Sequence, residues 1–488
     1  MADEGDNDDV NICHECVGDA LLKEEIRSEG PKRTCQFCGQ TRKAWPLEEL
    51  AERIQEVIEE HFRPTPCDPW SEGVAYDKEI GWERRGEPVA DLIAEIALLE
   101  PEAAEAVRES LSEKTSWNAY EGGYEDPFGD DACYEEGRPD TFGFRESWEF
   151  FRREIKTRSR FFGQHAQKAL DEIFGDLASL KTWQGTPAIK QILPADEARI
   201  LYRARIAYSE SDLQEFLSAP VKQIGPPPSH LARAGRMNAA GISVFYGAME
   251  ADTCIAEARA PVGSYVVLGN FEITRPVRVL DLDVLTTVVT EGSWFDPEFA
   301  TRSNRAAFLR HLVAEISRPI MPRDEEFEYL PTQAVSEYLA SCVEPRLDGI
   351  IFHSAQTAGA GRNVVLFNHA AVIEPYNLPV GTKLDFNMGW ASDDDYDDSI
   401  MIRETVPAKK TEEAESFDSV ASKPDTISEL APWGLSDATV EDDPIYAVPT
   451  LRLDVENIQI YRIRSVCYEK MARSVMRYRH SEDEQLPF

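Results

Sequence analysis

The early part of the chain carries apolar residues three and four positions apart, a spacing typical of helices with one buried face. Four such residues follow a proline: Leu47, Leu50, Ile54 and Val57. A second helical stretch runs from about 89 to 111, with Pro101 as a candidate break, and a third from about 145 to 177. The acidic, glycine-rich segment between them, 121–140, is expected to be a loop. We therefore expect residues 45–190 to form a mostly helical domain.

From about residue 193 the pattern changes to short runs rich in β-branched and aromatic residues, with glycine and proline between them. The expected strands are 201–207, 243–248, 265–273, 277–280, 349–353, 364–368 and 458–469. Helical patterns at 304–316 and 332–342 interrupt the strands, which predicts an α+β domain over 193–480. The acidic, Ser- and Glu-rich segment 391–443 is expected to be a flexible insertion, after which the last strand returns to the same sheet.

Composition narrows the function classes. At about 150 residues per domain, the 488 residues suggest roughly three domains. The 51 Lys and Arg against 89 Asp and Glu give a formal net charge of −38, which repels nucleic acid and anionic membranes. No apolar run approaches the roughly 18 residues of a membrane span, and the acidic start MADEGDNDDV does not look like a signal peptide. These features predict a soluble, cytoplasmic protein without a membrane partner, and they disfavour a nucleic-acid partner.

Four of the nine cysteines form two CxxC pairs, Cys13 with Cys16 and Cys35 with Cys38, separated by eighteen residues. Four thiolates in this spacing can close a tetrahedron around Zn²⁺ and leave no position for water, so the pattern predicts a structural zinc module over residues 1–44. Gly39 is expected to supply the positive φ of the second turn. The alternative is a chance pairing. The other cysteines are expected to be ordinary buried thiols: Cys67, Cys133, Cys254, Cys342 and Cys467.

Polar residues suited to a phosphorylated nucleotide gather in the β-rich domain: Arg203, Arg205, Arg233, Arg236, Tyr246, Glu257, Ser354 and Asn363. Guanidinium forks bind phosphate in a bidentate manner, and several can hold a diphosphate. Glu257, expected where a helix opens, can hydrogen-bond ribose hydroxyls and stabilise a developing cation, and Tyr246 can stack on an aromatic base. The alternative is that the arginines form surface ion pairs and that Tyr246 belongs to the core.

This half of the chain resembles a RES domain. The pieces that carry the resemblance are Leu201-Tyr-Arg-Ala, Gly235-Arg-Met-Asn through Tyr246, Ala256-Glu257, Pro331-Thr-Gln-Ala-Val, Asp348-Gly-Ile-Ile-Phe-His-Ser354 and Asn363-Val-Val-Leu-Phe367. Met237 stands where the family usually has an aromatic residue in Gly-Arg-Trp-Asn. The resemblance covers roughly residues 195–385 and 445–475.

RES domains resemble ADP-ribosyltransferases in fold, and members of the family are NAD-degrading toxins. The resemblance therefore implies NAD as the substrate. The residues that it assigns to NAD binding are Arg203, Arg236, Tyr246 and Asn363. It further implies that Glu257 stabilises the ribosyl oxocarbenium while the C1′–N bond breaks, that Tyr246 shapes the nicotinamide pocket, and that Ser354 hydrogen-bonds the nicotinamide ribose. Water, phosphate or a macromolecule remain open as the acceptor.

The N-terminal half is similar to the zinc-plus-HEPN-like segment found ahead of some RES domains, on Cys13-His-Glu-Cys16, Cys35-Gln-Phe-Cys-Gly39 and Leu47-Glu-Glu-Leu-Ala. HEPN ribonucleases use Arg-x4–6-His, and both Arg160 and Arg158 precede His165 at fitting distances on a predicted helix. A chain with eight His is expected to contain about one such match by accident. The favoured interpretation is a packed helix with Phe161 and Phe162 on its core side.

Three function classes follow. The first is an enzyme that cleaves the nicotinamide N-glycosidic bond of NAD by hydrolysis or phosphorolysis, as a toxin or defence effector. The second transfers ADP-ribose to a macromolecule, and the third is a HEPN-type ribonuclease or RNA-binding module with a nucleotide-sensing RES domain. An enzyme that destroys NAD needs restraint, so we expect a protein regulator or antitoxin, or gating by residues 45–185, which are also the candidate region for homo-oligomer formation.

Overall fold

The structure, a computed structural model, describes residues 10–67, 84–119, 126–160, 163–387, 390–391, 396–397, 400–407, 448–467 and 470–476. The chain divides into two compact units. The first combines Met1–Ile189 with Asp281–Arg318, and the second combines Lys190–Leu280 with Pro319–Phe488. The fold class is α+β, as the sequence predicts.

The first unit begins with a small antiparallel sheet in the order β1-β3-β2. Its elements are β1 (Asn11–Cys13), η1 (His14–Cys16), α1 (Ala20–Glu29), β2 (Lys32–Thr34) and β3 (Thr41–Pro46). Ile12, Leu22 and Ile26 are fully buried in one hydrophobic cluster together with Leu50 and Ile54 from the following helix. The cysteine module therefore shares its core with the helices that follow it.

Three helices with the predicted apolar spacing build this core: α2 (Leu47–His61), α3 (Val89–Ala97) and α4 (Pro101–Ala119). The expected break before Pro101 is confirmed, because Leu98 ends α3 in a left-handed conformation. The expected loop 121–140 is wrong in part. Its residues Cys133–Glu136 form β6, the central strand between β4 (Phe62–Pro64) and β5 (Glu87–Pro88).

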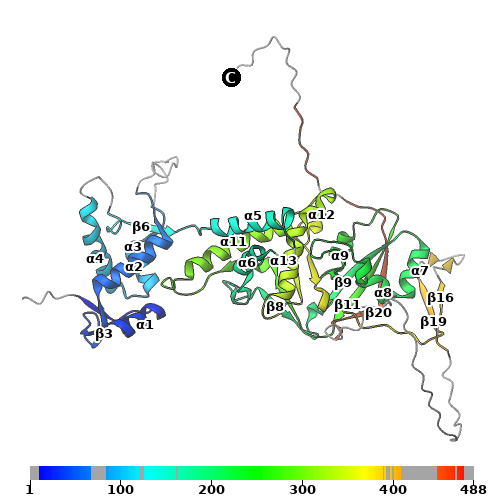
Figure 1. Ribbon diagram of the computed structural model, residues 1–488, viewed down its shortest axis with the longest axis horizontal. Coiled ribbons are helices and arrows are strands. Elements are labelled where there is room, and N and C mark those ends of the chain that lie inside the picture. The colour runs from blue at the N-terminus through cyan, green and yellow to red at the C-terminus, as the bar shows by residue number, and fades with distance from the viewer. Residues whose placement is uncertain are drawn as a thin grey trace, which may run out of the picture. The chain divides into compact units, whose positions relative to one another are not determined.

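The first unit also contains α5 (Phe142–Thr157), α6 (Gln164–Phe174), η2 (Leu177–Ser179), β7 (Lys181–Thr182), α10 (Leu282–Leu285), β13 (Val288–Val289) and α11 (Phe299–Ser317). The sequence places α11 among the strands of the second domain. In the structure it packs against α5 (Figure 1). At this contact Trp148 Nε1 donates to Glu315 Oε2 at 2.9 Å. Phe295, just before α11, is 1% exposed in the core of α2 to α4, and Arg53 Nη2 donates to its carbonyl at 2.9 Å. These contacts explain why 281–318 groups with the first unit.

The second unit is built on one sheet in the order β20-β11-β9-β10-β15-β14-β12-β8. Figure 1 labels β20, β11, β9 and β8 of this sheet. The strands are β8 (Ile189–Ile192), β9 (Ile200–Ala207), β10 (Phe245–Ala248), β11 (Tyr265–Ile273), β12 (Val277–Asp281), β14 (Gly349–His353), β15 (Arg362–Leu366) and β20 (Leu451–Arg462). Most bounds lie close to the predicted ones. The last strand, β20, pairs antiparallel with β11, which confirms its return to the sheet.

Helices of the second unit lie on both faces of this sheet. They are α7 (Glu210–Ser218), α8 (Pro220–Ile224), α9 (Ala251–Ala258), α12 (Glu325–Glu328) and α13 (Leu330–Ser341), with short 3-10 turns at η3 (Glu197–Arg199), η4 (Ser229–Leu231), η5 (Pro322–Asp324), η6 (Ala355–Thr357) and η7 (Asn368–Ala370). One face packs Leu201 and Phe245 with Ile224 of α8. The other packs Ala248 and Leu268 with α9.

The segment expected to be a flexible insertion, 391–443, is described only in part. Met401–Thr405 forms β19, which pairs with β16 (Lys383–Asn387), and β17 (Trp390–Ala391) pairs with β18 (Tyr396–Asp397). The expectation of flexibility is therefore wrong for β19, and 408–443 lies outside the described residues. No helix in the described part of the chain is both long and apolar enough to cross a membrane.

The prediction that the five cysteines outside the CxxC pairs are buried is confirmed only for Cys254. Cys133 is half-buried, and three are exposed: Cys67, Cys342 and Cys467. Cys342 follows the last residue of α13, and Cys467 follows β20, so both lie where the chain leaves the packed elements.

Candidate functional sites

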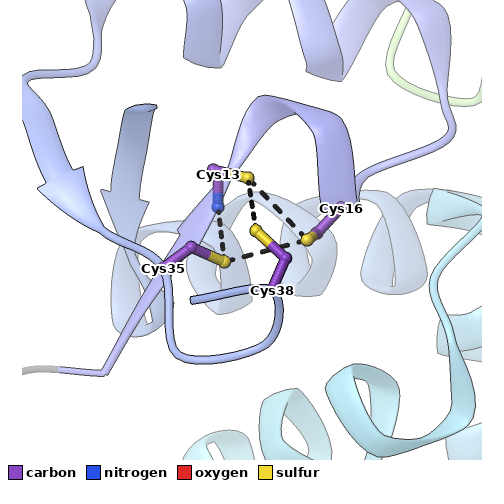
Figure 2. A group of neighbouring side chains, drawn as sticks. All are labelled: Cys13, Cys16, Cys35 and Cys38. Atoms are coloured by element: carbon purple, nitrogen blue, oxygen red, sulfur yellow. Dashed lines mark hydrogen bonds between the residues drawn. The ribbon is translucent and has the colours of Figure 1, made fainter. Parts of the chain in front are cut away.

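The four cysteines of the two CxxC pairs converge on one point (Figure 2). Cys13 ends β1 and Cys16 ends η1, while Cys35 and Cys38 lie in the turn between β2 and β3. The Sγ atoms of neighbouring cysteines are 3.6 to 3.7 Å apart, and all four lie within 4.8 Å of one another. A tetrahedron with metal–sulfur bonds of about 2.3 Å has edges of about 3.8 Å. The predicted positive φ of Gly39 is confirmed at +69°. This cluster can hold a metal ion.

The pKa values of three of the thiols are shifted in different directions by their surroundings. Burial raises the pKa of Cys13 and of Cys16, whereas the backbone amide of Gln40 lowers the pKa of Cys38 to about 7. The backbone N–H of Cys13 donates to Cys35 Sγ at 3.4 Å. Buried thiolates need a compensating positive charge, which a metal ion supplies.

In the second unit, Glu257 is held by two of the predicted site residues. Ser354 Oγ donates to Glu257 Oε1 at 2.6 Å, and Asn363 Nδ2 donates to the same oxygen at 2.8 Å. Ser354 is fully buried and Asn363 is 9% exposed, so both donors are fixed by their surroundings. Among the described residues, no hydrogen bond reaches Oε2. One carboxylate oxygen is therefore anchored, and the other is available to a ligand.

The expectation that Glu257 lies where a helix opens is wrong. Glu257 is the second-last residue of α9, and Arg259 follows as a left-handed cap. A carboxylate in the last turn of a helix faces the negative end of the helix dipole, which opposes its charge. The hydrogen bonds that Ser354 and Asn363 donate to the carboxylate offset this repulsion.

Tyr246 of β10 holds the turn that carries Arg236. Its hydroxyl donates to Asn238 Oδ1 at 2.8 Å and accepts the backbone N–H of Met237 at 2.9 Å. Burial raises the pKa of Tyr246, so the hydroxyl stays protonated and can donate. A Cβ on Gly235 would lie 2.7 Å from both the Tyr246 hydroxyl and Asn238 Oδ1, so only glycine fits there. Tyr246 thus acts on the loop through its hydroxyl.

Asn238 is a residue that the sequence analysis did not single out, although it belongs to the quoted Gly-Arg-Met-Asn piece. It is 4% exposed, and its Nδ2 donates to the carbonyls of Arg233, Ala239 and Ile242 at 2.9, 3.1 and 2.9 Å. A buried side-chain amide with this many backbone partners fixes the local chain path. The available signal was an Asn placed three residues from a glycine on either side, Gly235 and Gly241.

The sheet register places Tyr246, which holds the Arg236 turn, next to the group formed by Glu257, Ser354 and Asn363. Tyr246 pairs with Val365 and Ala248 pairs with Asn363, so Tyr246 and Asn363 lie on the same face of neighbouring strands. Diagonal neighbours of this kind are about 7 to 8 Å apart. α9 covers the same face and brings Glu257 there. Tyr246, Asn363, Glu257 and Ser354 therefore belong to one region, with Arg236 on the adjoining turn.

Arg203 points to the other face of the sheet. Its neighbour Tyr202 pairs with Ala248, and side chains alternate along a strand, so Arg203 projects away from Glu257. Arg203 Nε donates to the carbonyl of Ile224 at 2.8 Å and Nη1 to that of Tyr246, while Arg205 Nη2 donates to Gly225 at 2.9 Å. Burial lowers the pKa of Arg203, and the positive charge of Arg205 lowers it further. In this structure the two arginines cap the end of α8, and Arg203 does not join Arg236.

A separate cavity of about 330 Å³ lies behind the Arg236 turn. Met237 and Asn238 line it from the turn, Ser336 from α13, and His369 from the segment after β15. Glu257, Ser354 and Asn363 do not line it. Glu257 and Ser354 meet Asn363 at the start of β15, whereas His369 lies beyond the end of that strand.

The Arg160–His165 motif is not on one helix, so that expectation is wrong. α5 ends at Thr157 with Arg158 as its cap, Arg160 lies in a bend, and α6 begins at Gln164. Arg160 and His165 are both exposed, and the ring of His165 lies 5.8 Å from that of Phe150. Phe161 and Phe162, expected on the core side, lie outside the described residues.

Two family models match the chain. The RES domain model matches residues 200–387, and the model described as HEPN/RES N-terminal domain 1 matches residues 28–169. No curated protein and no solved structure matches the chain. The first match includes Arg236, Tyr246 and the Glu257 group; the second includes Cys35, Cys38 and the helices from α2 into α6. The chain is a RES domain protein with a HEPN/RES N-terminal domain ahead of its RES domain.

Proposed function

We propose that this protein cleaves the bond between nicotinamide and ribose in NAD. The observation that carries the proposal is Glu257, with one oxygen anchored by Ser354 and Asn363 and the other left for a ligand. Arg236 on the adjoining turn supplies a cation for the diphosphate. The RES match supports NAD as the ligand, because RES domains resemble NAD-consuming enzymes.

The cleavage step needs no general acid, because the leaving group does not have to be protonated. The C1′–N bond breaks with its electron pair going to the pyridinium nitrogen, so nicotinamide leaves as a neutral molecule without being protonated. The positive charge moves to the ribosyl C1′–O4′ unit, and Glu257 stabilises it through a pre-placed negative charge. Water then adds to C1′ and releases its proton to solvent, which gives ADP-ribose. With phosphate as the nucleophile, the product is ADP-ribose 1″-phosphate.

The test is release of free nicotinamide from NAD by the purified full-length chain, with and without phosphate. Release that Glu257→Gln abolishes supports the proposal. Asp252→Asn is the matched control, because it removes the same charge from the exposed side of the same helix. No release by the wild-type chain under either condition would overturn the proposal. With NAD labelled in the adenylate, label left on a protein or nucleic acid would indicate ADP-ribosyl transfer instead of hydrolysis.

We further propose that the four cysteines bind one structural Zn²⁺. All four donors are thiols, the ligand type that selects zinc, and a four-thiolate site leaves no position for water or substrate. The ion would tie the two turns together without taking part in NAD cleavage. A cell that carries such an NAD-consuming enzyme loses its NAD, which is the basis for proposing a role as a toxin or defence effector.

A further inference from the structure

Helix α13 and the residue that caps its N-terminus, Tyr329, present a row of polar side chains on one face. Tyr329, Thr332, Gln333 and Ser336 are spaced i, i+3, i+4 and i+7, the spacing of residues on a single helical face. This face is buried: Thr332 and Gln333 are 7% exposed and Ser336 is 3% exposed. Burying a polar group without a partner is costly, so such a row requires matched acceptors opposite it.

The acceptors are three consecutive carbonyls of the Arg236 turn. Gln333 Nε2 donates to Gly235 O at 2.8 Å, Thr332 Oγ1 to Arg236 O at 2.6 Å, and Ser336 Oγ to Met237 O at 2.7 Å. The Thr332 hydroxyl has one hydrogen, and its contact with Arg236 is shorter than the 3.0 Å to Tyr329 O. One helix face thus holds every carbonyl from 235 to 237.

The fourth residue of the row touches the arginine side chain itself. The guanidinium carbon of Arg236 lies 5.4 Å from the centre of the Tyr329 ring, a cation–π distance. On its other side, the turn is held by the Tyr246 hydroxyl and Asn238. The backbone of Arg236 is therefore fixed from two sides, and its side chain lies against the ring of Tyr329, the residue that caps α13.

We propose that Thr332, Gln333 and Ser336 are positioning residues that hold Arg236 where its guanidinium meets the diphosphate of NAD. Packing alone would be served by an apolar helix face, whereas this face uses three polar side chains to fix a single turn. The inference rests on the proposed function for its ligand. We call the three hydrogen bonds from Thr332, Gln333 and Ser336 to the carbonyls of 235–237 the clamp, and its effect on the turn can be measured without NAD.

The test uses Thr332→Val and Ser336→Ala, which keep the side-chain volume nearly constant and remove one donor each. We expect each variant to raise KM for NAD by about tenfold, equivalent to about 1.4 kcal/mol, with a much smaller change in kcat. Thr332→Ser restores the donor and should restore KM. In an Arg236→Ala background, Thr332→Val should add less than about twofold, because the arginine it positions is absent.

Ser264→Ala is the matched control. Ser264 is 5% exposed and donates to the Pro261 carbonyl at 2.7 Å, so its replacement removes the same kind of bond as that of Ser336, but to a carbonyl outside the turn 235–237. It should leave KM unchanged. Unchanged KM in Thr332→Val and Ser336→Ala, or an equal rise in the Arg236→Ala background, would overturn the proposal.

A second measurement separates this proposal from the proposed function. Amide hydrogen exchange across residues 233–242 should be about tenfold faster in the Thr332→Val/Ser336→Ala double variant than in wild type and in Ser264→Ala. If wild type does not cleave NAD but exchange responds in this way, the reaction is wrong and the clamp stands. If NAD is cleaved but neither KM nor exchange responds, the clamp is wrong and the reaction stands.

Discussion

The cysteine cluster of the first unit and the Glu257 group of the second differ in how completely their polar atoms are used. Every sulfur of the cysteine cluster faces the other three, so a bound ion would be enclosed by the protein. Glu257 has two donors on one oxygen and, among the described residues, none on the other. A closed set of ligands stabilises a fold, whereas a set with one atom left over can act on a ligand. The difference predicts opposite consequences for mutations in the two sites.

The largest expected effect is on the closed site. Cys35→Ser should reduce zinc to less than about one ion per chain and cost several kcal/mol of stability, since structural zinc contributes about 10 to 16 kcal/mol in zinc-finger peptides. Cys16 and Phe37 pack both against the cluster of Cys13 and Cys35 and against the core that α1 shares with α2. Thermal unfolding of the first unit should therefore move to a lower temperature. Metal analysis and calorimetry measure both effects. Cys133→Ser, in β6 of the same unit, should change neither, and a full zinc content in Cys35→Ser would refute the closed site.

A mutation in the Glu257 group should have the opposite effect: activity is lost and stability is kept. Glu257→Gln keeps the shape and an oxygen that can accept from Ser354 and Asn363, so the melting temperature should stay close to that of wild type. Loss of the charge should lower kcat by about 10³-fold, or about 4 kcal/mol, the size typical of removing one group that stabilises a developing charge. Nicotinamide release gives the rate, with Asp252→Asn as the control. Residual activity within tenfold of wild type would mean that Glu257 does not face the reacting centre.

Asp348 sharpens the comparison, because it is a carboxylate in the second unit that uses both oxygens. Oδ1 accepts from Arg275 Nη2 at 2.9 Å and lies 3.6 Å from His369 Nε2, and Oδ2 accepts the backbone N–H of Arg278 at 2.8 Å. Burial alone would raise the pKa of Asp348, but the nearby His369 ring and the hydrogen bonds from Arg275 and the Arg278 amide outweigh it and lower the pKa from 3.8 to about 2. Both oxygens of Asp348 thus have partners within the protein, as all four sulfurs of the cysteine cluster do. We therefore expect Asp348 to contribute to stability.

Linkage gives the pH window for Asp348. A carboxylate with a lowered pKa stabilises the fold above its unfolded pKa, and this contribution disappears as pH falls through the folded pKa. The shift from 3.8 to about 2 corresponds to about 2 kcal/mol. Asp348→Asn should therefore be about 2 kcal/mol less stable than wild type at pH 7, and the two should converge between pH 3.8 and 2. Chemical denaturation at several pH values measures the difference. A difference that is constant down to pH 2 would contradict this account.

The sequence predicts the closed site better than the open one, for a physical reason. The cysteines lie within one short segment, so two local turns bring them together. Glu257 meets Ser354 and Asn363 across 97 and 106 residues, and only the sheet register creates that contact. The resemblance supplied the residue types, while their mutual geometry needed the fold.

Other differences have equally specific causes. Arg203 lies next to Tyr202 in sequence, but strand alternation puts it on the opposite face, where it caps α8. The helical pattern at 304–316 is correct, but a helical pattern does not say which core a helix joins, and α11 joins the first unit. The row on α13 was quoted only as part of a family piece, because a polar helix face ordinarily indicates solvent and not a buried turn.

The smallest predicted effect decides what Ser354 does. The resemblance implies a hydrogen bond to the nicotinamide ribose, whereas in the structure the single hydroxyl hydrogen goes to Glu257 and the oxygen accepts the Gln356 N–H at 3.2 Å. If Ser354 acts through Glu257, Ser354→Ala should lower kcat by about tenfold, because Asn363 still anchors the same oxygen and one hydrogen bond to a charged group is worth about 1.5 kcal/mol or more. Ser264→Ala, at another buried serine, should leave kcat unchanged.

The two roles separate once the carboxylate is absent. In Glu257→Ala, a Ser354 that acts through Glu257 has no oxygen to orient, so adding Ser354→Ala should leave the Kd for NAD within about twofold. A Ser354 that contacts the ribose keeps that contact without the carboxylate, so the same addition should weaken NAD binding by about tenfold. Calorimetric titration of the single and double variants with NAD measures this directly, because neither turns the substrate over at an appreciable rate. A tenfold loss would assign Ser354 to the substrate and leave Asn363 as the donor that fixes Glu257.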